Sequence, residues 1–123
     1  IKPLFANIDA EQIRMALKNI LQNAIQAMDG SGALSIVAAP AASGVVEISI
    51  TDTGPGIPAD HLEKVFEPLF STKPHGIGFG LSIAKMIVEN HGGTIRAEAP
   101  AAGGARFVMT FPQDMPPRLC GER

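Results

Sequence analysis

Cysteine is almost absent from this sequence: the 123 residues include one, Cys120, near the C-terminal end. A disulfide framework needs at least two cysteines, so we expect none, and a reducing, cytoplasmic setting fits best. No apolar run approaches the length of a membrane span, and no charged-then-apolar leader opens the chain, so we expect no membrane contact. The formal net charge is -2, which excludes a broad basic surface for nucleic acid.

Several patterns that mark common enzyme and metal sites are also missing. The three histidines, His61, His75 and His91, lie apart from any cluster of cysteines or paired acids, so a zinc site is not indicated. No serine–histidine–aspartate geometry can be argued from the spacing. The sequence begins at IKPLF without an initiator methionine, and we therefore expect it to be a fragment of a longer protein.

The sequence does have enough apolar material for one core. Hydrophobic residues make up 46% of the chain and charged residues 18%, which is typical of a globular domain. There is no internal repeat and no linker in residues 1–112. We expect a single domain over residues 1–112 and a loose C-terminal tail over residues 113–123.

Hydrophobic periodicity and turn signals predict three helices and five strands. Asp9, with Gln12 three residues later, has the pattern of a capping box, and so do Asp60 and Glu63. A sheet with helices on one face would bury the amphipathic helices, which predicts an α+β fold built as a two-layer α/β sandwich. The expected helices are residues 10–28, 61–66 and 79–90, and the expected strands are 1–6, 33–39, 45–52, 94–99 and 105–111.

Two asparagines on the first helix are candidates for ligand binding. Asn19 and Asn23 are four residues apart, so their side chains point the same way at the edge of the apolar face. Either these amides bond to a neighbouring loop, as polar groups beside a core must, or they offer oxygens to a hard cation such as Mg²⁺. Because no carboxylate accompanies them, such a cation would have to be shared with a phosphate-bearing ligand.

Asp52 ends a predicted strand and is followed at once by glycines in the stretch DTGPGIP. Either its carboxylate starts an Asx-turn, or it lies at the mouth of a cleft and accepts hydrogen bonds from a ligand's amino group. In the second case Gly54 and Gly56 would let the backbone approach a flat ring closely. The sequence leaves both interpretations open.

Three glycines at alternate positions, Gly76, Gly78 and Gly80, precede the last helix in HGIGFGLSIAK. The stretch matches neither a P-loop nor a dinucleotide fingerprint. Either it is a hinge without a ligand, or its unobstructed N–H groups form an anion site at the helix N-terminus. Lys73 is the one cation within reach of such a site, although in isolation it has the pattern of a solvated lysine. Phe66 is expected to pack in the core or against the lid-like stretch EPLFSTKPHG, residues 67–76.

The order of these motifs resembles the ATP-binding catalytic domain of sensor histidine kinases, the family that shares its ATP fold with gyrase, heat-shock chaperone and mismatch-repair ATPases. LKNILQNAIQAM is similar to the N box, DTGPGIP to the first glycine box, VFEPLF to the phenylalanine box and GIGFGLSIAK to the second glycine box. The resemblance covers about residues 3–112, and the short STKP lid is similar to that of nitrogen-regulation kinases. It implies the Bergerat ATP-binding fold, a mixed sheet of about five strands with three helices on one face, with ATP and Mg²⁺ as cofactors.

The resemblance also implies a role for each matching residue. Asn23 would coordinate Mg²⁺, and Asn19 would contact the phosphates or the water shell of the metal. Asp52 would accept the adenine amino group. The implied catalytic residues are Asn19, Asn23 and Lys73, and the implied nucleotide-binding residues are these three with Asp52, Gly54, Gly56, Ile57, Gly76, Gly78, Gly80 and Leu81.

Three positions depart from the family pattern. Hydrolytic relatives have a glutamate one helical turn before the metal-binding asparagine, where it activates water; Asn19 stands there and cannot act as a base, which favours transfer over hydrolysis. Gln26 replaces a lysine or arginine that many sensor kinases have, so phosphate neutralisation must depend on Lys73 and Mg²⁺. Ala105 stands where a hydroxyl residue is common.

The sequence therefore predicts a domain that binds Mg·ATP and donates the γ-phosphoryl group to a histidine by positioning and charge neutralisation. None of its histidines opens the acceptor pattern of the family. The acceptor should lie on a dimerisation and histidine-phosphotransfer hairpin upstream of Ile1, and a cognate response regulator is the expected partner. The alternatives are a nucleotide-binding regulatory module, or a hydrolytic ATPase or serine kinase of the same fold.

Overall fold

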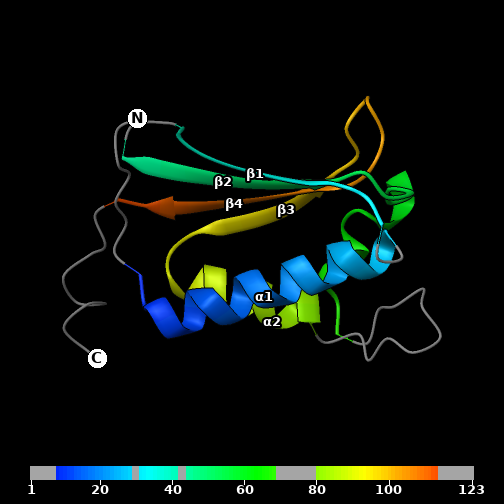
Figure 1. Cartoon of the computed structure of the whole chain (residues 1–123). Helices are drawn as coiled ribbons and strands as arrows, with labels where there is room; N and C mark the ends of the chain where they lie inside the picture. Colours follow the sequence, from blue (N-terminus) through cyan, green and yellow to red (C-terminus); the bar gives the residue numbers. More distant parts are fainter. Residues whose placement is uncertain (1–7, 29–30, 42–43, 69–79, 114–123) are drawn as a thin grey trace.

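The computed structural model describes residues 8–28, 31–41, 44–68 and 80–113. Two α-helices lie on one face of a β-sheet, so the described part is a two-layer sandwich (Figure 1). In chain order the elements are α1 (Ala10–Ala27), β1 (Leu34–Pro40), β2 (Val45–Asp52), the 3₁₀ turns η1 (Ala59–His61) and η2 (Lys64–Phe66), α2 (Gly80–Asn90), β3 (Thr94–Glu98) and β4 (Arg106–Pro112).

The sheet has four strands in the order β1-β2-β4-β3, and all three pairings are antiparallel. The expected mixed sheet stays a prediction, because the fifth expected strand is not among these four. Short loops join β1 to β2 and β3 to β4, and a parallel pair would need a crossover of a dozen or more residues. The strand expected at residues 1–6 lies outside the described residues. The other four strands are confirmed, each within one residue of its predicted bounds.

The core lies between the helices and the inward face of the sheet. Phe66 is 8% exposed and meets Phe107 edge-on, with ring centroids 6.1 Å apart, so the expectation that Phe66 packs in the core or the lid is confirmed for the core. The fully buried large side chains are Ile20, Ile50, Val88, Phe107, Val108, Met109 and Phe111.

Helix α1 begins where the sequence predicts, but only half of the predicted capping box forms. The Asp9 carboxylate oxygen Oδ1 accepts hydrogen bonds from the backbone N–H groups of Glu11 and Gln12, at 3.0 and 3.2 Å. This satisfies two of the donors that a helix N-terminus leaves free. The N–H of Asp9 itself does not pair with the Gln12 side chain, as a full box requires; it donates to His91 Nε2 at 3.0 Å.

The short helix expected at residues 61–66 is wrong: this segment forms the two 3₁₀ turns, and neither has a side-chain cap. The predicted Asp60–Glu63 capping box is therefore also wrong. The segment lies between Pro58 and Pro68, and so short a stretch gains too few hydrogen bonds to offset the nucleation of an α-helix. The turns still bury Val65 and Phe66.

Helix α2 ends in a Schellman motif formed by the HGG stretch, residues 91–93. The N–H of Gly93 donates to the carbonyl of Val88 and the N–H of Gly92 to that of Glu89, both at 3.0 Å. Gly92 adopts the left-handed conformation that this cap requires, with φ of +76°. The chain thereby reverses at His91 and enters β3.

An apolar groove runs along the outer side of α1. Edge strand β1 overhangs the helices on this side: Ile36 is 57% exposed, although its register partner Ile50 is 1% exposed on the same face of the sheet. The groove is lined by Ile8, Ala10, Ile13, Arg14, Leu17, Lys18, Leu21, Gln22 and Ile25.

In the described ranges no helix is both long and apolar enough to cross a membrane.

Candidate nucleotide-binding site

Asp52, the last residue of β2, is 3% exposed and is held by two backbone donors. Its Oδ1 accepts the N–H of Gly54 at 2.8 Å and that of Ala105 at 3.2 Å. The first bond is the Asx-turn that the sequence allows. Because both of these donors go to Oδ1, Oδ2 is the oxygen that can accept a hydrogen bond from a ligand, so the two interpretations of Asp52 are compatible.

The loop between β3 and β4 closes against Asp52 and the first glycine box. The N–H of Asp52 donates to the carbonyl of Ala105 at 2.9 Å. Gly104 has φ of +78°, and a Cβ there would overlap the carbonyl oxygen of Asp52. Gly56 has φ of +87°, and a Cβ there would lie 2.9 Å from the carbonyl oxygen of Gly104. Both glycines are thus needed for close backbone approach.

The first glycine box also lies beside the end of α1. A Cβ on Gly54 would lie 3.3 Å from the carbonyl oxygen of Ala27. Ala27 is one turn beyond Asn23, so the Asp52 loop is adjacent to the asparagine face of the helix. Sequence positions 23 and 52 are brought together by this contact.

The N-terminus of α2 lies on the same face of α1, further toward its start. A Cβ on Gly80 would lie 3.8 Å from the Cβ of Asn19. Asn19 and Asn23 are both half-buried, and Asn23 takes part in a polar contact. From Asn19 to Ala27 the helix rises about 12 Å. An elongated site therefore runs along α1 from the Asp52 loop to the start of α2.

The remaining predicted residues fall into two groups. Ile57 and Leu81 are half-buried and pack against the core at the two ends of this site. Lys73, Gly76 and Gly78 lie outside the described residues. Gly104 was not predicted as part of the site, and position 105 entered only as a departure from the family pattern near the adenine. The backbone contact of Ala105 was not predicted, because it acts on a residue more than 50 positions away.

The side-chain oxygens at the α2 end of the site can bind a hard cation only if a bound ligand supplies further oxygens to complete its coordination. Asn19 and Asn23 can offer amide oxygens, which Mg²⁺ accepts while keeping several waters. Asp52, the buried carboxylate, belongs to the other end of the site. Within the described ranges no three histidine, cysteine, aspartate or glutamate side chains are grouped as metal ligands. The arrangement suits a metal shared with phosphate oxygens.

Comparison with known proteins identifies the family. Residues 8–115 match the family described as Histidine kinase-, DNA gyrase B-, and HSP90-like ATPase, so the chain belongs to it. Within that family its relatives are sensor histidine kinases. It is 44% identical over 104 residues to sensor histidine kinase ZraS of Escherichia coli O157:H7 and 42% identical over 106 residues to sensor protein FixL of Bradyrhizobium diazoefficiens.

These matches cover 85% of this chain but 22% of ZraS and 21% of FixL, so the chain spans about a fifth of these relatives. Among solved structures, the nucleotide-free catalytic domain of histidine kinase ThkA superposes with a TM-score of 0.78 at 37% identity, covering 88% of this chain and 70% of that one. The predicted α+β sandwich and the predicted relationship to histidine kinase catalytic domains are both confirmed.

Proposed function

We propose that this chain is the ATP-binding catalytic domain of a two-component sensor histidine kinase, which transfers the γ-phosphoryl group of Mg·ATP to a histidine outside these 123 residues. The observation that carries the proposal is the arrangement along α1. Asp52 lies near one end of a single helix face and Gly80 near the other, with Asn23 and Asn19 between them. This matches a ligand with a base at one end and phosphates at the other.

The base binds at the Asp52 end. Asp52 Oδ2 accepts the adenine amino group, while Oδ1 stays bonded to the N–H groups of Gly54 and Ala105. Those two bonds fix the carboxylate before the ligand arrives, which lowers the ordering cost of binding. Gly54 and Gly56 bring bare backbone to the ring, and Ile57 supplies an apolar contact beside it.

The phosphates bind at the α2 end. The N–H groups of Gly80 and Leu81 open an 11-residue helix, and helix N-termini favour anions through free donors and the helix dipole. In the proposal Gly76, Gly78 and Lys73 complete the phosphate site. Asn23 holds Mg²⁺ through its amide oxygen, with Asn19 beside it. Mg²⁺, when bound, neutralises phosphate charge during transfer.

The same residues disfavour hydrolysis. An asparagine amide does not accept a proton, so Asn19 cannot activate water as a general base. Transfer then occurs only when an imidazole nitrogen attacks the γ-phosphorus. A phosphorus–nitrogen bond forms, the bond from phosphorus to the bridging oxygen breaks, and ADP leaves. The segment that carries the imidazole must hold the attacking nitrogen in line with the phosphorus–oxygen bond that breaks. Such positioning lowers the activation barrier by on the order of 7–11 kcal/mol.

Partners and location follow from this role. The acceptor histidine belongs to a dimerisation hairpin, and the phosphoryl group passes on to a response regulator in the cytoplasm. Two similar solved structures support parts of this role: full-length ShkA in complex with AMPPNP supports the nucleotide, and ThkA in complex with the response regulator TrrA supports the response regulator. ATP is the nucleotide that the description of the family as ATPases supports.

A transfer assay with γ-labelled ATP tests the function. The 123-residue chain should bind Mg·ATP, release phosphate hardly at all and take up no label. Adding the acceptor hairpin of the longer protein, even as a separate chain, should give an acid-labile phosphohistidine on the hairpin. Brisk phosphate release without the hairpin would indicate an ATPase, acid-stable label a serine kinase, and binding without transfer a regulatory module; each would overturn the proposal.

A further inference from the structure

His91 and Asp52 are the two buried side chains with ionisable groups in the described part of the chain. The nucleotide site uses Asp52. His91 is 5% exposed and lies at the far end of α2 from Gly80. A buried imidazole must satisfy both ring nitrogens, so its partners are informative.

Each nitrogen of His91 has a backbone partner on a different helix. Nε2 accepts the N–H of Asp9 at 3.0 Å, at the start of α1. Nδ1 lies 2.8 Å from the carbonyl oxygen of Ile87 in the last turn of α2. A carbonyl can only accept and an N–H can only donate, so the ring is neutral with its proton on Nδ1.

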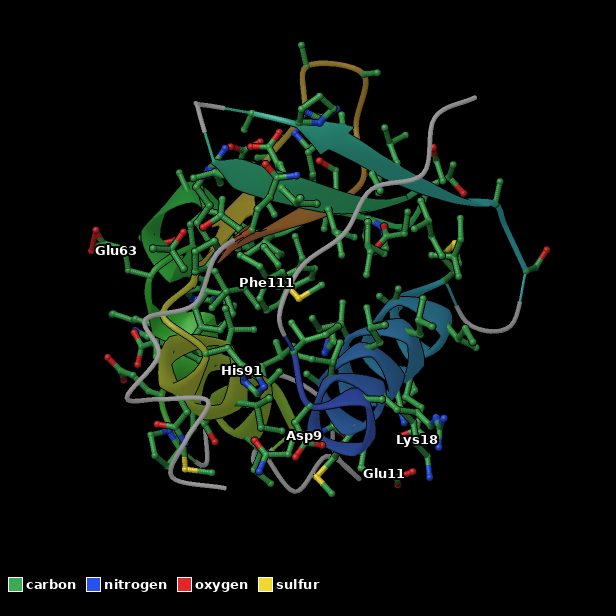
Figure 2. The ribbon with its side chains drawn as sticks, turned by 90° about the vertical axis from the view of Figure 1, so that its left-hand side faces the viewer. Asp9, Glu11, Lys18, Glu63, His91 and Phe111 are labelled. Atoms are coloured by element: carbon green, nitrogen blue, oxygen red, sulfur yellow. The ribbon has the colours of Figure 1, made fainter. Side chains whose placement is uncertain are left out.

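His91 thereby links three elements. Its ring also meets Phe111 of β4 edge-on, with centroids 6.5 Å apart and planes at 87°. Figure 2 shows His91 between the end of α2 and the start of α1, with Phe111 on the sheet side. The bond to Asp9 replaces the missing half of the α1 capping box.

Helices α1 and α2 are antiparallel and meet at two marked points. One is His91 against Asp9, and the other is Gly80 against Asn19. These points are about 15 Å apart along α1, by the rise of its residues. A packed helix moves as a rigid rod, so a slip at the first point displaces Asn19 and Asn23 along α2.

We propose that His91 is a positioning residue for the phosphate and metal end of the nucleotide site, acting through the axial register of α1 against α2. The inference rests on the proposed function. At the base end Asp52 is bonded to the backbone of Ala105 in the β3–β4 loop and not to α1, so a slip of α1 displaces Asp52 less than it displaces Asn19 and Asn23. Loss of the His91–Asp9 bond therefore weakens contacts to Mg²⁺ and phosphates and spares contacts to the base.

Two substitutions separate the two bonds of His91. His91→Asn keeps a donor near the Ile87 carbonyl and loses the acceptor for Asp9, whereas His91→Gln can place an amide oxygen where Nε2 lies. We expect His91→Asn to raise the dissociation constant for Mg·ATP on the order of tenfold, since small displacements in such sites are costly. It should leave AMP binding unchanged, and His91→Gln should restore Mg·ATP binding. Calorimetry with AMP and Mg·ATP measures both.

Val88→Ala is the matched control, because it removes buried volume from the same helix without touching either bond of His91. It should lower stability and leave the ratio of the two dissociation constants unchanged. Equal losses for AMP and Mg·ATP in His91→Asn, or the same selective loss in Val88→Ala, would show a purely structural role. Wild-type protein that binds neither ligand would instead contradict the proposed function.

The unmodified chain provides a second test that needs no variant to fold. Coupling is reciprocal: the His91–Asp9 bond should strengthen Mg·ATP binding by a certain factor, and Mg·ATP should slow hydrogen exchange at the Asp9 amide by the same factor. AMP should not slow it. Nitrogen-15 spectra should show His91 protonated at Nδ1. A ring protonated at Nε2, or Asp9 exchange unaffected by Mg·ATP, overturns the proposal.

Discussion

The two oxygens of Asp52 have different partners, and this separates its structural role from its ligand role. Oδ1 satisfies two backbone N–H groups that would otherwise be buried without a partner. A buried donor left unsatisfied costs about 1–3 kcal/mol. Substitutions at Asp52 must therefore be judged on stability and on affinity together.

Asp52→Asn can keep an oxygen toward Gly54 and Ala105 and turn an amide NH₂ toward the ligand. The domain should stay folded, while affinity for ATP and ADP falls alike by about 1.5–3 kcal/mol, the worth of a charged hydrogen bond. Asp52→Ala should lose stability as well, which thermal unfolding will report. Asp60→Asn, on an exposed residue, is the control. Unchanged calorimetric affinity for Asp52→Asn would remove Asp52 from the base site.

Asn23→Ala should leave a folded domain in which Mg²⁺ no longer strengthens ATP binding or supports transfer. Asn19→Asp should partly retain function through its remaining oxygen. Gln22→Ala removes an exposed amide from the same helix and should change nothing. The measurement is ATP affinity with and without Mg²⁺. If Asn23→Ala keeps the full Mg²⁺ effect, the metal binds elsewhere.

Single residues differed in how far the sequence could predict them. Asn19 and Asn23 share a helix, so their common direction follows from periodicity alone, and the structure places Asn19 beside Gly80. Asp52 was also marked by its place before two glycines. Its two anchoring contacts with the β3–β4 loop were not predicted, because they depend on the pairing of β2 with β4 and not on neighbours in the chain.

At the scale of elements, the β3–β4 loop acts as a support for the base end of the site. It contains two neighbouring glycines with left-handed backbone, Gly103 at φ of +99° and Gly104 at +78°. A Cβ on Gly103 would meet open space, whereas one on Gly104 would meet the backbone of Asp52. Alanine substitutions at these two glycines can therefore separate the cost of left-handed backbone strain from the effect of displacing Asp52.

Gly103→Ala should therefore cost only the left-handed strain, about 1–2 kcal/mol of unfolding free energy. Gly104→Ala carries the same strain and also pushes Asp52 aside, so it should lose more stability and weaken ATP binding as well. Denaturant unfolding and calorimetry on both variants give the comparison. Equal effects on affinity would mean that the loop does not position Asp52.

Element ends were predicted where the signal is local and missed where it is not. The Schellman end of α2 follows from HGG, and Asp9 caps α1 with its own side chain. The second half of that cap comes from His91, 82 positions away. The expected helix at 61–66 failed because a capping pattern cannot supply the length that an α-helix needs.

At the scale of the whole molecule, the helices cover the sheet unevenly. Order β1-β2-β4-β3 puts β1 at an edge, and α1 contacts β2 whereas α2 contacts β4 and β3. The groove beside α1 and the exposed face of Ile36 are the result. The sequence predicted amphipathic helices but not this asymmetry, since the apolar stripe of α1 is wider than the surface that the described sheet offers it.

Ile25→Glu tests this surface, with Met15→Glu as its control. Both residues lie on α1 and are similarly exposed, at 49% and 53%, but only Ile25 lines the groove. Neither substitution should destabilise the 123-residue chain. Ile25→Glu should reduce binding of a fluorescent apolar dye, and Met15→Glu should not. Equal dye binding in all three proteins would show that the groove does not attract apolar molecules.

The exposed groove also bears on how concentrated preparations of this domain will behave. The groove beside α1 and the exposed face of β1 around Ile36 are two apolar surfaces on each protein molecule. They attract other molecules at short range, and the electrostatic repulsion from a net charge of -2 is weak. The osmotic second virial coefficient should be negative and should fall further in sulfate, which is excluded from protein surfaces. Cloud points should therefore rise with salting-out strength, and mild detergent should clear the suspension without unfolding the chain.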